Sequence, residues 1–370
     1  MRVLIAPDSF KGSLTSVEVA TSLASGWREA RPDDDVLLAP LADGGEGTLV
    51  AIAAAGGWEW VSTTATDPLG RSVIARWLRS TDRRRAVVEL AEASGLSRVA
   101  ATERDPIGAS TRGTGEVLRA VLDAGIRDIT LGIGGSATTD GGAGILSALG
   151  CSVVPGAVTL DGLDARLVDT SLRIACDVTN PLLGPTGAAA TYGPQKGATP
   201  QQVQVLDAAL ERYADGLEAA SGRRERETPG AGAAGGTGFG LLCLRDRFRS
   251  LELVPGIDVV MEAADFGGKL ATADLVITGE GRIDGQTAFG KTALGVAQRA
   301  HTAGVACIAV GGGVEPEGIE ALRPLGAAVV PVVERPQSIE DAMTAGVAPV
   351  RRCGERIARL VSLGASGRSS

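Results

Sequence analysis

The sequence is poor in aromatic residues, in histidine and in long apolar runs. Aromatic residues make up only 3% of the 370 residues, whereas glycine occurs 52 times, which predicts many tight turns and close backbone approaches. The single histidine, His301, falls in a predicted amphipathic helix, so we expect a solvated side chain and no histidine base. No run of about 20 uncharged apolar residues occurs, and the opening MRVLIAPDSF is too short for a signal peptide. We therefore expect a cytoplasmic protein with no membrane partner.

Cysteine usage and charge exclude further classes of protein. The five cysteines are widely spaced and form no CxxC pair, so we expect reduced core residues and neither a disulfide framework nor a zinc site. A formal net charge of −8 without any basic stripe argues against nucleic acid as a partner. The length of 370 residues favours two domains, and the composition leaves the oligomeric state open.

Short runs of Val, Ile, Leu and Ala alternate with helical patterns, which predicts an α/β protein with largely parallel sheet. Five strands with helices between them, at the two ends of the chain, predict one doubly wound, flavodoxin-like sheet. The strands are expected at residues 2–7, 35–42, 274–279, 306–312 and 328–333, and the helices at residues 16–30, 48–56, 292–304, 317–326 and 346–363.

The middle of the chain has a different pattern and predicts a second α/β domain. We expect residues 1–66 and 270–370 to form the discontinuous first domain, with residues 67–269 inserted into it. Within the insertion, SGRRERET (residues 221–228) is the best candidate for an exposed loop, because it is charged, nearly free of apolar residues and followed by Pro-Gly.

The segment GQTAFGKT (residues 285–292) fits the phosphate-loop pattern G-x-x-x-x-G-K-[ST] at every position. In a phosphate loop the first glycine directly follows a buried strand, and another strand supplies an Asp for the metal. Here the expected strand ends near Gly279, six residues before the pattern begins at Gly285, and no later strand ends in Asp. These observations favour an accidental match.

A second glycine pattern, Gly132-x-Gly134-x-x-Ala137, resembles the dinucleotide fingerprint and follows an expected strand. That fingerprint needs an acid at the end of the next strand to bind the ribose. The next apolar run, CSVVPG, ends in Pro155 and Gly156, so the sequence argues against a dinucleotide site.

Polar, glycine-flanked segments instead follow most of the expected strands, and the carboxyl ends of strands are where open α/β sheets bind ligands. Lysine is rare in this chain, yet Lys11, Lys196 and Lys291 all lie in such segments. Lysines and glycine N–H groups can hold a phosphate, and two or three carboxylates can hold Mg²⁺ through water. The segments are APDSFKGSL (6–14), LADGGEGT (41–48), GIGGSATTDGGAG (132–144), CDVTNPLLG (176–184) with YGPQKGA (192–198), and ITGEGRIDGQTAFGK (277–291).

Together with PGAGAAGG (229–236), these segments make the chain resemble the bacterial type I glycerate kinases. The resemblance runs from Met1 to about residue 350 through seven motifs in order. Two positions depart from the family pattern: Thr139, where Asn is expected, and Tyr192, where Phe is expected. The Gln-Thr and Gly-Lys of the apparent phosphate loop belong to the family's own ITGEGRID-x-QT-x-x-GK segment.

The resemblance implies a two-domain α/β fold with the active site in the cleft, and ATP-dependent phosphorylation of D-glycerate with 2-phosphoglycerate as the favoured product. The implied partners are ATP and glycerate, with Mg²⁺ as cofactor. Two alternatives stay open: a P-loop-type or other small-molecule kinase or ATPase, and a non-catalytic two-domain protein that binds a small ligand.

The candidate site residues follow from the same motifs. We predict catalytic roles for Lys11, Asp8, Asp43 and Lys196, with Asp8 and Asp43 as candidate metal ligands. Substrate or nucleotide contacts are predicted for Ser9, Glu46, Gly134, Gly135, Ser136, Thr138, Asp140, Asp177, Asn180, Glu280, Asp284 and Lys291.

Structural alternatives exist for many of these residues. Lys11 could lie in a turn that Ser13 or Thr15 caps. Acids such as Asp43 and Glu46 are also favourable at a helix N-terminus without any catalytic role. Turn-forming roles remain open for Ser136, Thr138, Asp177 and Asn180.

Overall fold

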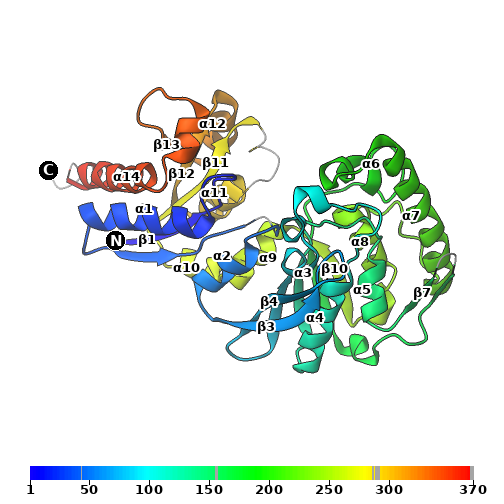
Figure 1. Ribbon diagram of the computed structural model, residues 1–370. Helices are drawn as coiled ribbons and strands as arrows, with labels where there is room; N and C mark the ends of the chain where they lie inside the picture. The colour runs from blue at the N-terminus through cyan, green and yellow to red at the C-terminus, as the bar shows by residue number, and fades with distance from the viewer. Residues whose placement is uncertain (43, 155–156, 286, 288–291, 367–370) are drawn as a thin grey trace. The chain divides into compact units, whose positions relative to one another are not determined.

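The computed structural model describes residues 1–42, 44–154, 157–285, 287 and 292–366 (Figure 1). The chain divides into two compact units. The first unit consists of Met1–Asp43, Val50–Gly56 and Val260–Ser370, and the second of Gly44–Leu49 and Gly57–Val259.

The first unit is built on a five-stranded sheet with the order β13-β12-β11-β1-β2, in which every pairing is parallel. Its strands are β1 (Arg2–Pro7), β2 (Asp35–Leu38), β11 (Leu275–Ile283), β12 (Ala306–Val314) and β13 (Ala328–Pro331). Its helices are α1 (Ser16–Ala30), α10 (Phe266–Leu270), α11 (Thr292–Ala303), α12 (Pro316–Leu322), α13 (Ile339–Thr344) and α14 (Ala348–Ser366), with most of α2 (Thr48–Ala55).

The centre of this sheet is apolar. There β1 and β11 lie side by side and run in the same direction. Val3 to Ala6 of β1 are fully buried, as a strand covered on both faces must be. β1 pairs with β11 from Val3 opposite Leu275 to Pro7 opposite Gly279. The polar residues that follow Pro7 and Gly279 therefore emerge at the same edge of the sheet.

Helices α1 and α14 lie side by side in this unit (Figure 1). Thr15 begins α1 with a capping box, because its hydroxyl accepts from Glu18 N while Glu18 accepts from Thr15 N. Two glycines allow the close approach of the helices: a Cβ at Gly26 would lie 1.8 Å from Arg351 O, and one at Gly354 would lie 2.3 Å from Leu23 O.

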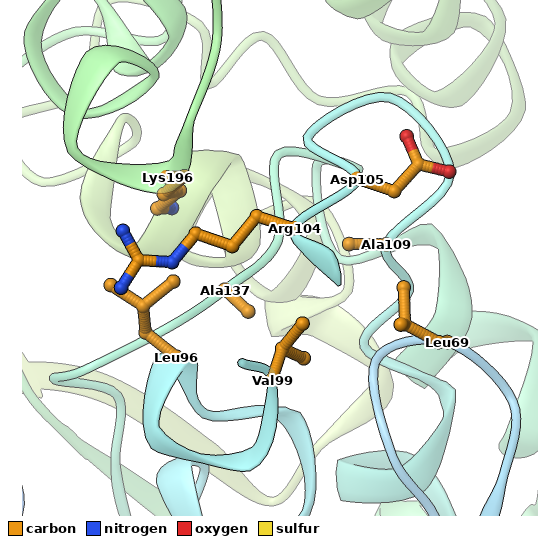
Figure 2. A pocket seen from close by; sticks show the side chains of 8 residues that line it. All are labelled: Leu69, Leu96, Val99, Arg104, Asp105, Ala109, Ala137 and Lys196. Atoms are coloured by element: carbon orange, nitrogen blue, oxygen red, sulfur yellow. The ribbon is translucent and has the colours of Figure 1, made fainter. Parts of the chain in front are cut away.

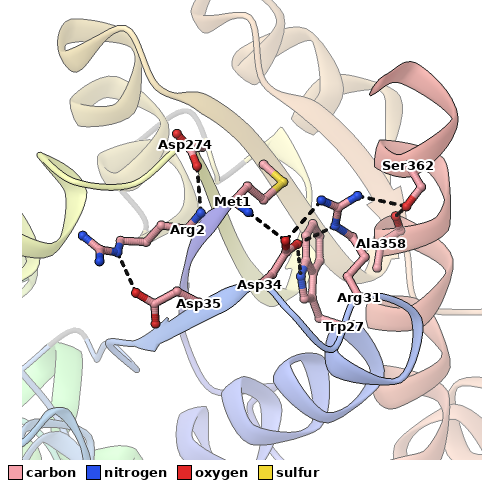
Figure 3. A network of polar contacts seen from close by, with 9 residues as sticks. All are labelled: Met1, Arg2, Trp27, Arg31, Asp34, Asp35, Asp274, Ala358 and Ser362. Carbon is pink, nitrogen blue, oxygen red and sulfur yellow. Dashed lines mark hydrogen bonds and ion pairs between the residues drawn. The ribbon is translucent and has the colours of Figure 1, made fainter. Parts of the chain in front are cut away.

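A buried carboxylate links the end of α1 to its neighbours (Figure 3). Asp34 accepts hydrogen bonds from the Met1 amine, from Trp27 Nε1 and from the Arg31 guanidinium, which also donates to Ser362 of α14. Burial by itself would raise the pKa of Asp34, but these donors outweigh it and hold the pKa at about 2. Arg31 and Asp34 thereby fasten the loop after α1 to α14.

The second unit contains a six-stranded mixed sheet with the order β10-β9-β6-β5-β4-β3 and a separate β7-β8 hairpin. Its strands are β3 (Trp58–Thr66), β4 (Ser72–Ser80), β5 (Arg85–Glu89), β6 (Asp128–Gly132), β7 (Ser152–Val154), β8 (Ala157–Thr159), β9 (Ser171–Ala175) and β10 (Ser250–Val254). Its helices are α3 (Ala91–Ser94), α4 (Arg112–Asp123), α5 (Ala143–Ala148), α6 (Ala188–Tyr192), α7 (Pro200–Ser221), α8 (Ala233–Leu242) and the first half of α9 (Gly256–Ala263).

Four strands of this sheet, β5, β6, β9 and β10, run parallel, while β3 and β4 add an antiparallel edge. β3 pairs with β4 from Trp58 opposite Ser80 to Thr66 opposite Ser72. This hairpin places β3 in the second unit, although the sequence-based boundary lies after residue 66. The mixed α/β architecture with parallel sheets agrees with the expected fold class.

Several details of the chain differ from the sequence-based expectations. β11 extends to Ile283, beyond the expected end near Gly279, because Glu280, Arg282 and Ile283 keep pairing with β12. The loop of residues 221–228 is less exposed than expected: Gly222, Arg224 and Glu227 are exposed, whereas Glu225 is only 4% exposed and accepts from Arg223 and Thr228. Charged side chains therefore anchor this loop.

The expected burial of most cysteines and the expected exposure of His301 are confirmed. The cysteines are all free, and they are buried except for the half-buried Cys176. His301 is exposed on α11. Within the described part of the chain, we find no helix with the length and hydropathy needed to cross a bilayer.

Candidate functional site

The first unit gathers carboxylates and threonines where β1 and β11 end. Asp8 directly follows β1 and is 7% exposed; its Oδ2 accepts from Thr292 Oγ1 at 2.6 Å and its Oδ1 from Ser9 N at 2.6 Å. Glu280 is also 7% exposed and accepts from Thr287 Oγ1 at 2.8 Å. The sheet thus places the predicted residues Asp8, Ser9 and Glu280 at one edge.

Lys11 and Asp284 lie in the segments that follow these strand ends. Lys11 is exposed in the turn between Phe10 and Leu14, whose backbone groups hydrogen-bond to each other. The carboxylate of Asp284 lies 3.5 Å from Arg282 Nε, and Asp284 N donates to Thr287 Oγ1. The predicted residues Asp43 and Lys291 lie outside the described residues.

The structure removes both sequence arguments against the phosphate-loop pattern. β11 ends at Ile283 and α11 begins at Thr292, so a strand and a helix directly flank the segment 285–292. An Asp is also supplied by a neighbouring strand, since Asp8 follows β1 and binds the Thr292 hydroxyl. Asp8 was predicted from the sequence as a metal ligand, but not as the Asp of this pattern, because it precedes the pattern in the chain.

The argument against a dinucleotide site also changes. Among the described residues, β7, which begins within CSVVPG, pairs only with β8. The strands beside β6 are β5 and β9, and Asp177 closely follows β9. The fingerprint fails for another reason: α5 begins at Ala143, well after Ala137, so no helix opens at the last position of the pattern.

In the second unit, Lys196 joins two of the predicted glycine-rich segments. It ends the short 3₁₀ helix Pro194–Lys196, is 2% exposed, and donates from Nζ to Ser136 Oγ at 2.8 Å and to Thr138 O at 2.5 Å. Burial lowers the pKa of Lys196 to about 7, and the charge of Asp140 opposes this shift. Lys196 therefore holds the loop after β6 and is poised to change its charge near neutral pH.

Asp140 organises the same loop from its other end. Its carboxylate accepts from the N–H and hydroxyl of Thr111, both at 2.8 Å, and from the N–H groups of Gly142 and Gly144 at 3.1 Å. Within the described residues, the buried hydroxyls of Thr138 and Thr139 have no hydrogen-bond partner. The geometry therefore favours a structural role for Asp140, which holds the backbone of this loop in place.

Two glycine-rich segments touch each other at the carboxyl ends of the strands. A Cβ on Gly134 would lie 2.5 Å from Gly45 Cα, and one on Gly132 would lie 2.7 Å from Gly44 O. Gly135 has a φ of +73°, which an L side chain rarely adopts. Glu46 is exposed beside these glycines in the sequence. Glycine is needed here because backbone packs directly on backbone.

The other predicted residues of this unit make structural contacts. Asp177 is exposed and accepts from Gly256 N at 2.9 Å, which ties the end of β9 to the start of α9. Asn180 donates to Thr186 O and accepts from the Tyr192 hydroxyl at 2.7 Å. These contacts favour the turn-forming alternative for Asn180, and they use the hydroxyl by which Tyr192 departs from the expected Phe.

A small pocket adjoins Lys196 (Figure 2). It has room for no more than about one water molecule, far below the ~300–1,000 Å³ of typical small-molecule sites. Its walls are mostly apolar, and Arg104 spans its rim and donates to Gln195 O. This pocket does not by itself define a substrate site. Its lining residues are Leu69, Leu96, Val99, Arg104, Asp105, Ala109, Ala137 and Lys196.

Sequence analysis missed two residues at these strand ends, Thr292 and Glu89. Thr292 completes the G-x-x-x-x-G-K-[ST] pattern and could have been found from it. Glu89 ends β5 and is 5% exposed. Its only sequence signal is an acid at the end of a buried run, AVVEL.

Each unit thus presents carboxylates, hydroxyls and glycine backbone at the carboxyl edge of parallel strands, the arrangement of an α/β protein that binds a small charged ligand. A sequence model of the Glycerate kinase family matches residues 3–362. The chain belongs to the glycerate kinase family.

Relatives match over nearly the whole chain. A glycerate kinase of Bacillus subtilis (strain 168) is 42% identical over 98% of both chains. A glycerate 2-kinase of Escherichia coli (strain K12) is 42% identical over 80% of this chain and 81% of its own. The crystal structure of a protein described as glycerate kinase 2 from Salmonella typhimurium LT2 superposes with a TM-score of 0.85 at 41% identity, covering 99% of both chains.

Proposed function

We propose that the protein transfers the γ-phosphoryl group of ATP to D-glycerate and forms 2-phosphoglycerate. The observation that carries this proposal is the family match over residues 3–362. The E. coli relative named glycerate 2-kinase supports the C2 product. The seven motifs support a place among the bacterial type I enzymes. Because ATP is the donor, we place the reaction in the cytoplasm.

We further propose that the first unit is a doubly wound, flavodoxin-like domain into which the second α/β domain is inserted. Numbered within this unit, its strands have the order 2-1-3-4-5, which supports that arrangement. The position of the active site in a cleft stays a prediction.

Phosphoryl transfer needs little covalent chemistry from the protein, so positioning and charge neutralisation dominate. The residues present fit this need: Lys11 is an exposed cation just beyond β1, and the glycine segments of the second unit offer backbone N–H groups. A carboxylate is the expected base for the glycerate hydroxyl, because the sole histidine is exposed on α11.

Mg²⁺ binds oxygen ligands and commonly takes one or two protein carboxylates besides the substrate phosphates. Within the described residues, no three His, Cys, Asp or Glu side chains are grouped as potential metal ligands. Asp8 and Thr292, whose side-chain oxygens lie 2.6 Å apart, are of the right chemistry, and we propose that they hold the metal. When bound, Mg²⁺ would neutralise phosphate charge.

Purified protein with ATP, Mg²⁺ and D-glycerate is expected to release ADP and to form a phosphate ester at C2. Phosphorus NMR with proton coupling distinguishes C2 from C3, and a reaction without glycerate is the control. ATP hydrolysis at the same rate in that control would overturn the kinase proposal. No ATP consumption at all would favour the non-catalytic binding protein, whereas a C3 ester would correct only the position.

Gly134→Ala is expected to lower kcat/KM for this reaction about 100-fold, because a displacement near 1 Å at a reacting site has that effect. The new Cβ would lie 2.5 Å from Gly45 Cα, so the two glycine segments must separate. Gly267→Ala is the control, because nothing lies within 4 Å of its added Cβ. Steady-state kinetics of both variants test this; equal activity would show that the contact between the segments is unimportant.

A further inference from the structure

A buried glutamate holds one of the two glycine segments. Glu89 Oε1 accepts from Gly47 N at 2.9 Å, and its Oε2 accepts from Leu49 N at 3.3 Å. Glu89 is 5% exposed and lies opposite Gly132 in the pairing of β5 with β6. One carboxylate therefore satisfies two N–H groups around the start of α2 and ties them to the end of β5.

The segment that Glu89 holds lies across the ends of neighbouring strands. Gly44 approaches β9, since its Cβ would lie 2.8 Å from Ala175 Cβ, and Gly45 packs on Gly134. The backbone at Gly44 also closes on Gly132 of β6. The segment thus spans β5, β6 and β9 and meets the loop that carries Ser136 and Thr138.

The position costs the carboxylate its solvation. Burial raises the pKa of Glu89 to about 7, and the nearby acids Glu92 and Glu46 add to the shift, while the two backbone N–H groups oppose it. A neutral residue would avoid this cost. A carboxylate has an advantage that offsets this cost: its two oxygens can accept hydrogen bonds from two N–H groups at once.

We propose that Glu89 is a positioning residue for phosphoryl transfer: its carboxylate fixes Gly44–Leu49 across the strand ends, so that the glycine backbone and Glu46 keep their places beside the Ser136 loop. This proposal rests on the proposed kinase function. Glu89 itself need not touch a substrate, because it acts through the segment that it holds.

Glu89→Gln is the direct test, since it keeps the shape but offers an amide group to one of the two N–H donors. We expect hydrogen exchange of the Gly47 and Leu49 amides to quicken about tenfold, as loss of one such bond allows. We expect kcat/KM to fall about 10- to 100-fold, as for other residues that orient a site indirectly.

Glu116→Gln is the matched control. Glu116 also accepts a backbone N–H bond, from Thr66 N at 2.8 Å, but this bond joins β3 to α4 and not the glycine segments. It should leave exchange at Gly47 and Leu49, and kcat/KM, within about twofold of the wild type, as expected for independent sites. Equal effects of the two substitutions would reduce Glu89 to a general stability role and overturn the proposal.

The pH dependence separates positioning from stability. Ionised Glu89 accepts both N–H bonds, so kcat/KM of the wild type should rise with pH about a midpoint near 7, and Glu89→Gln should lose this limb. Lys196 titrates in the same range but loses charge as pH rises, so it would affect the opposite limb. Folding raises the pKa of Glu89 from the ordinary 4.5 to about 7, so between these values the folded chain binds a proton that the unfolded chain lacks, and the stability that Glu89 contributes declines as pH rises. The melting temperature of Glu89→Gln should therefore rise relative to that of the wild type across this range and stay raised above about pH 7, where the activity of the variant is poorest relative to the wild type.

Two further measurements keep the proposal open to refutation. If Glu89→Gln does not fold, exchange at Gly47 and Leu49 in the wild type, corrected for intrinsic rates, should still be slower at pH 8 than at pH 6. Equal corrected rates would overturn the proposal. If the wild type does not phosphorylate glycerate, the kinase function fails, while the exchange comparison still decides whether Glu89 fixes the segment.

Discussion

Replacing Lys11 by alanine is expected to lower kcat by about two to four powers of ten, because one charged contact to the transferring phosphoryl group contributes several kcal/mol. Lys11 lies three residues after Asp8, at the edge where β1 and β11 end. Its side chain is exposed, so the melting temperature should hardly change. The structural features of the alternative are also present, because Lys11 lies in the turn between Phe10 and Leu14 and Thr15 caps α1, so kinetics must distinguish a catalytic lysine from a turn residue.

Single-turnover kinetics, with thermal unfolding alongside, test this expectation. Lys11→Arg should also be impaired, because a planar guanidinium does not replace a compact ammonium group. Arg323→Ala removes another exposed cation of the same unit and should leave kcat unchanged. A Lys11→Ala protein with normal turnover, or one that unfolds, would identify Lys11 as a turn residue.

Lys196→Met is expected to reduce both stability and activity. The substitution leaves Ser136 Oγ and Thr138 O without their buried donor, and each unsatisfied group costs about 1–3 kcal/mol. The loop between β6 and α5 then loses its fastening to the 3₁₀ helix Pro194–Lys196, so we expect kcat/KM to fall at least about 100-fold.

The stability loss should also depend on pH. Burial holds the pKa of Lys196 at about 7, against 10.5 in its ordinary state, so between these values the unfolded chain binds a proton that the folded chain lacks. Stability from this residue therefore rises with pH across that range, by at most about 1.4 kcal/mol per pH unit. Denaturant unfolding at pH 7 and pH 9 should show that the free energy of unfolding of the wild type exceeds that of Lys196→Met by more at pH 9 than at pH 7.

Lys269→Met provides the control for Lys196. Lys269 donates to the carbonyl groups of Leu38, Ala55 and Ala264, so its loss should lower the free energy of unfolding without a change in kcat. If the difference in the free energy of unfolding between wild type and Lys196→Met shrinks as pH rises, the lowered pKa of Lys196 is contradicted.

The parts of the fold that local chemistry determines could be predicted from the sequence. β1 and α1 have the expected limits, because a compact apolar run forms the strand and a helical pattern that Thr15 and Glu18 cap forms the helix. The sequence-based end of β11 near Gly279 is too early, because its pairing with β12 continues to Ile283. Only the sheet shows that extension.

Some residues of the candidate site could likewise be predicted from the sequence, whereas others could be identified only from the fold. Asp8, Ser136 and Lys196 follow from the rule that ligands bind where parallel strands end, and the structure brings Ser136 and Lys196 into contact. Glu89 could not be ranked from the sequence, because its importance depends on where the segment Gly44–Leu49 packs. Thr292 was overlooked because its partner, Asp8, is far away in the chain.

The pairing of β1 with β11 sets an order of events during synthesis. Val3 of β1 pairs with Leu275 of β11, so the centre of this sheet cannot form until residue 275 has been synthesised. Helix α14, which packs on α1, is synthesised later still. The second unit is almost continuous from Gly57 to Val259, so the ribosome completes it first. Until then β1 has only β2 beside it, and its other edge is open. An open strand edge can pair with other chains, so we expect slow or interrupted synthesis to lower the yield of folded enzyme.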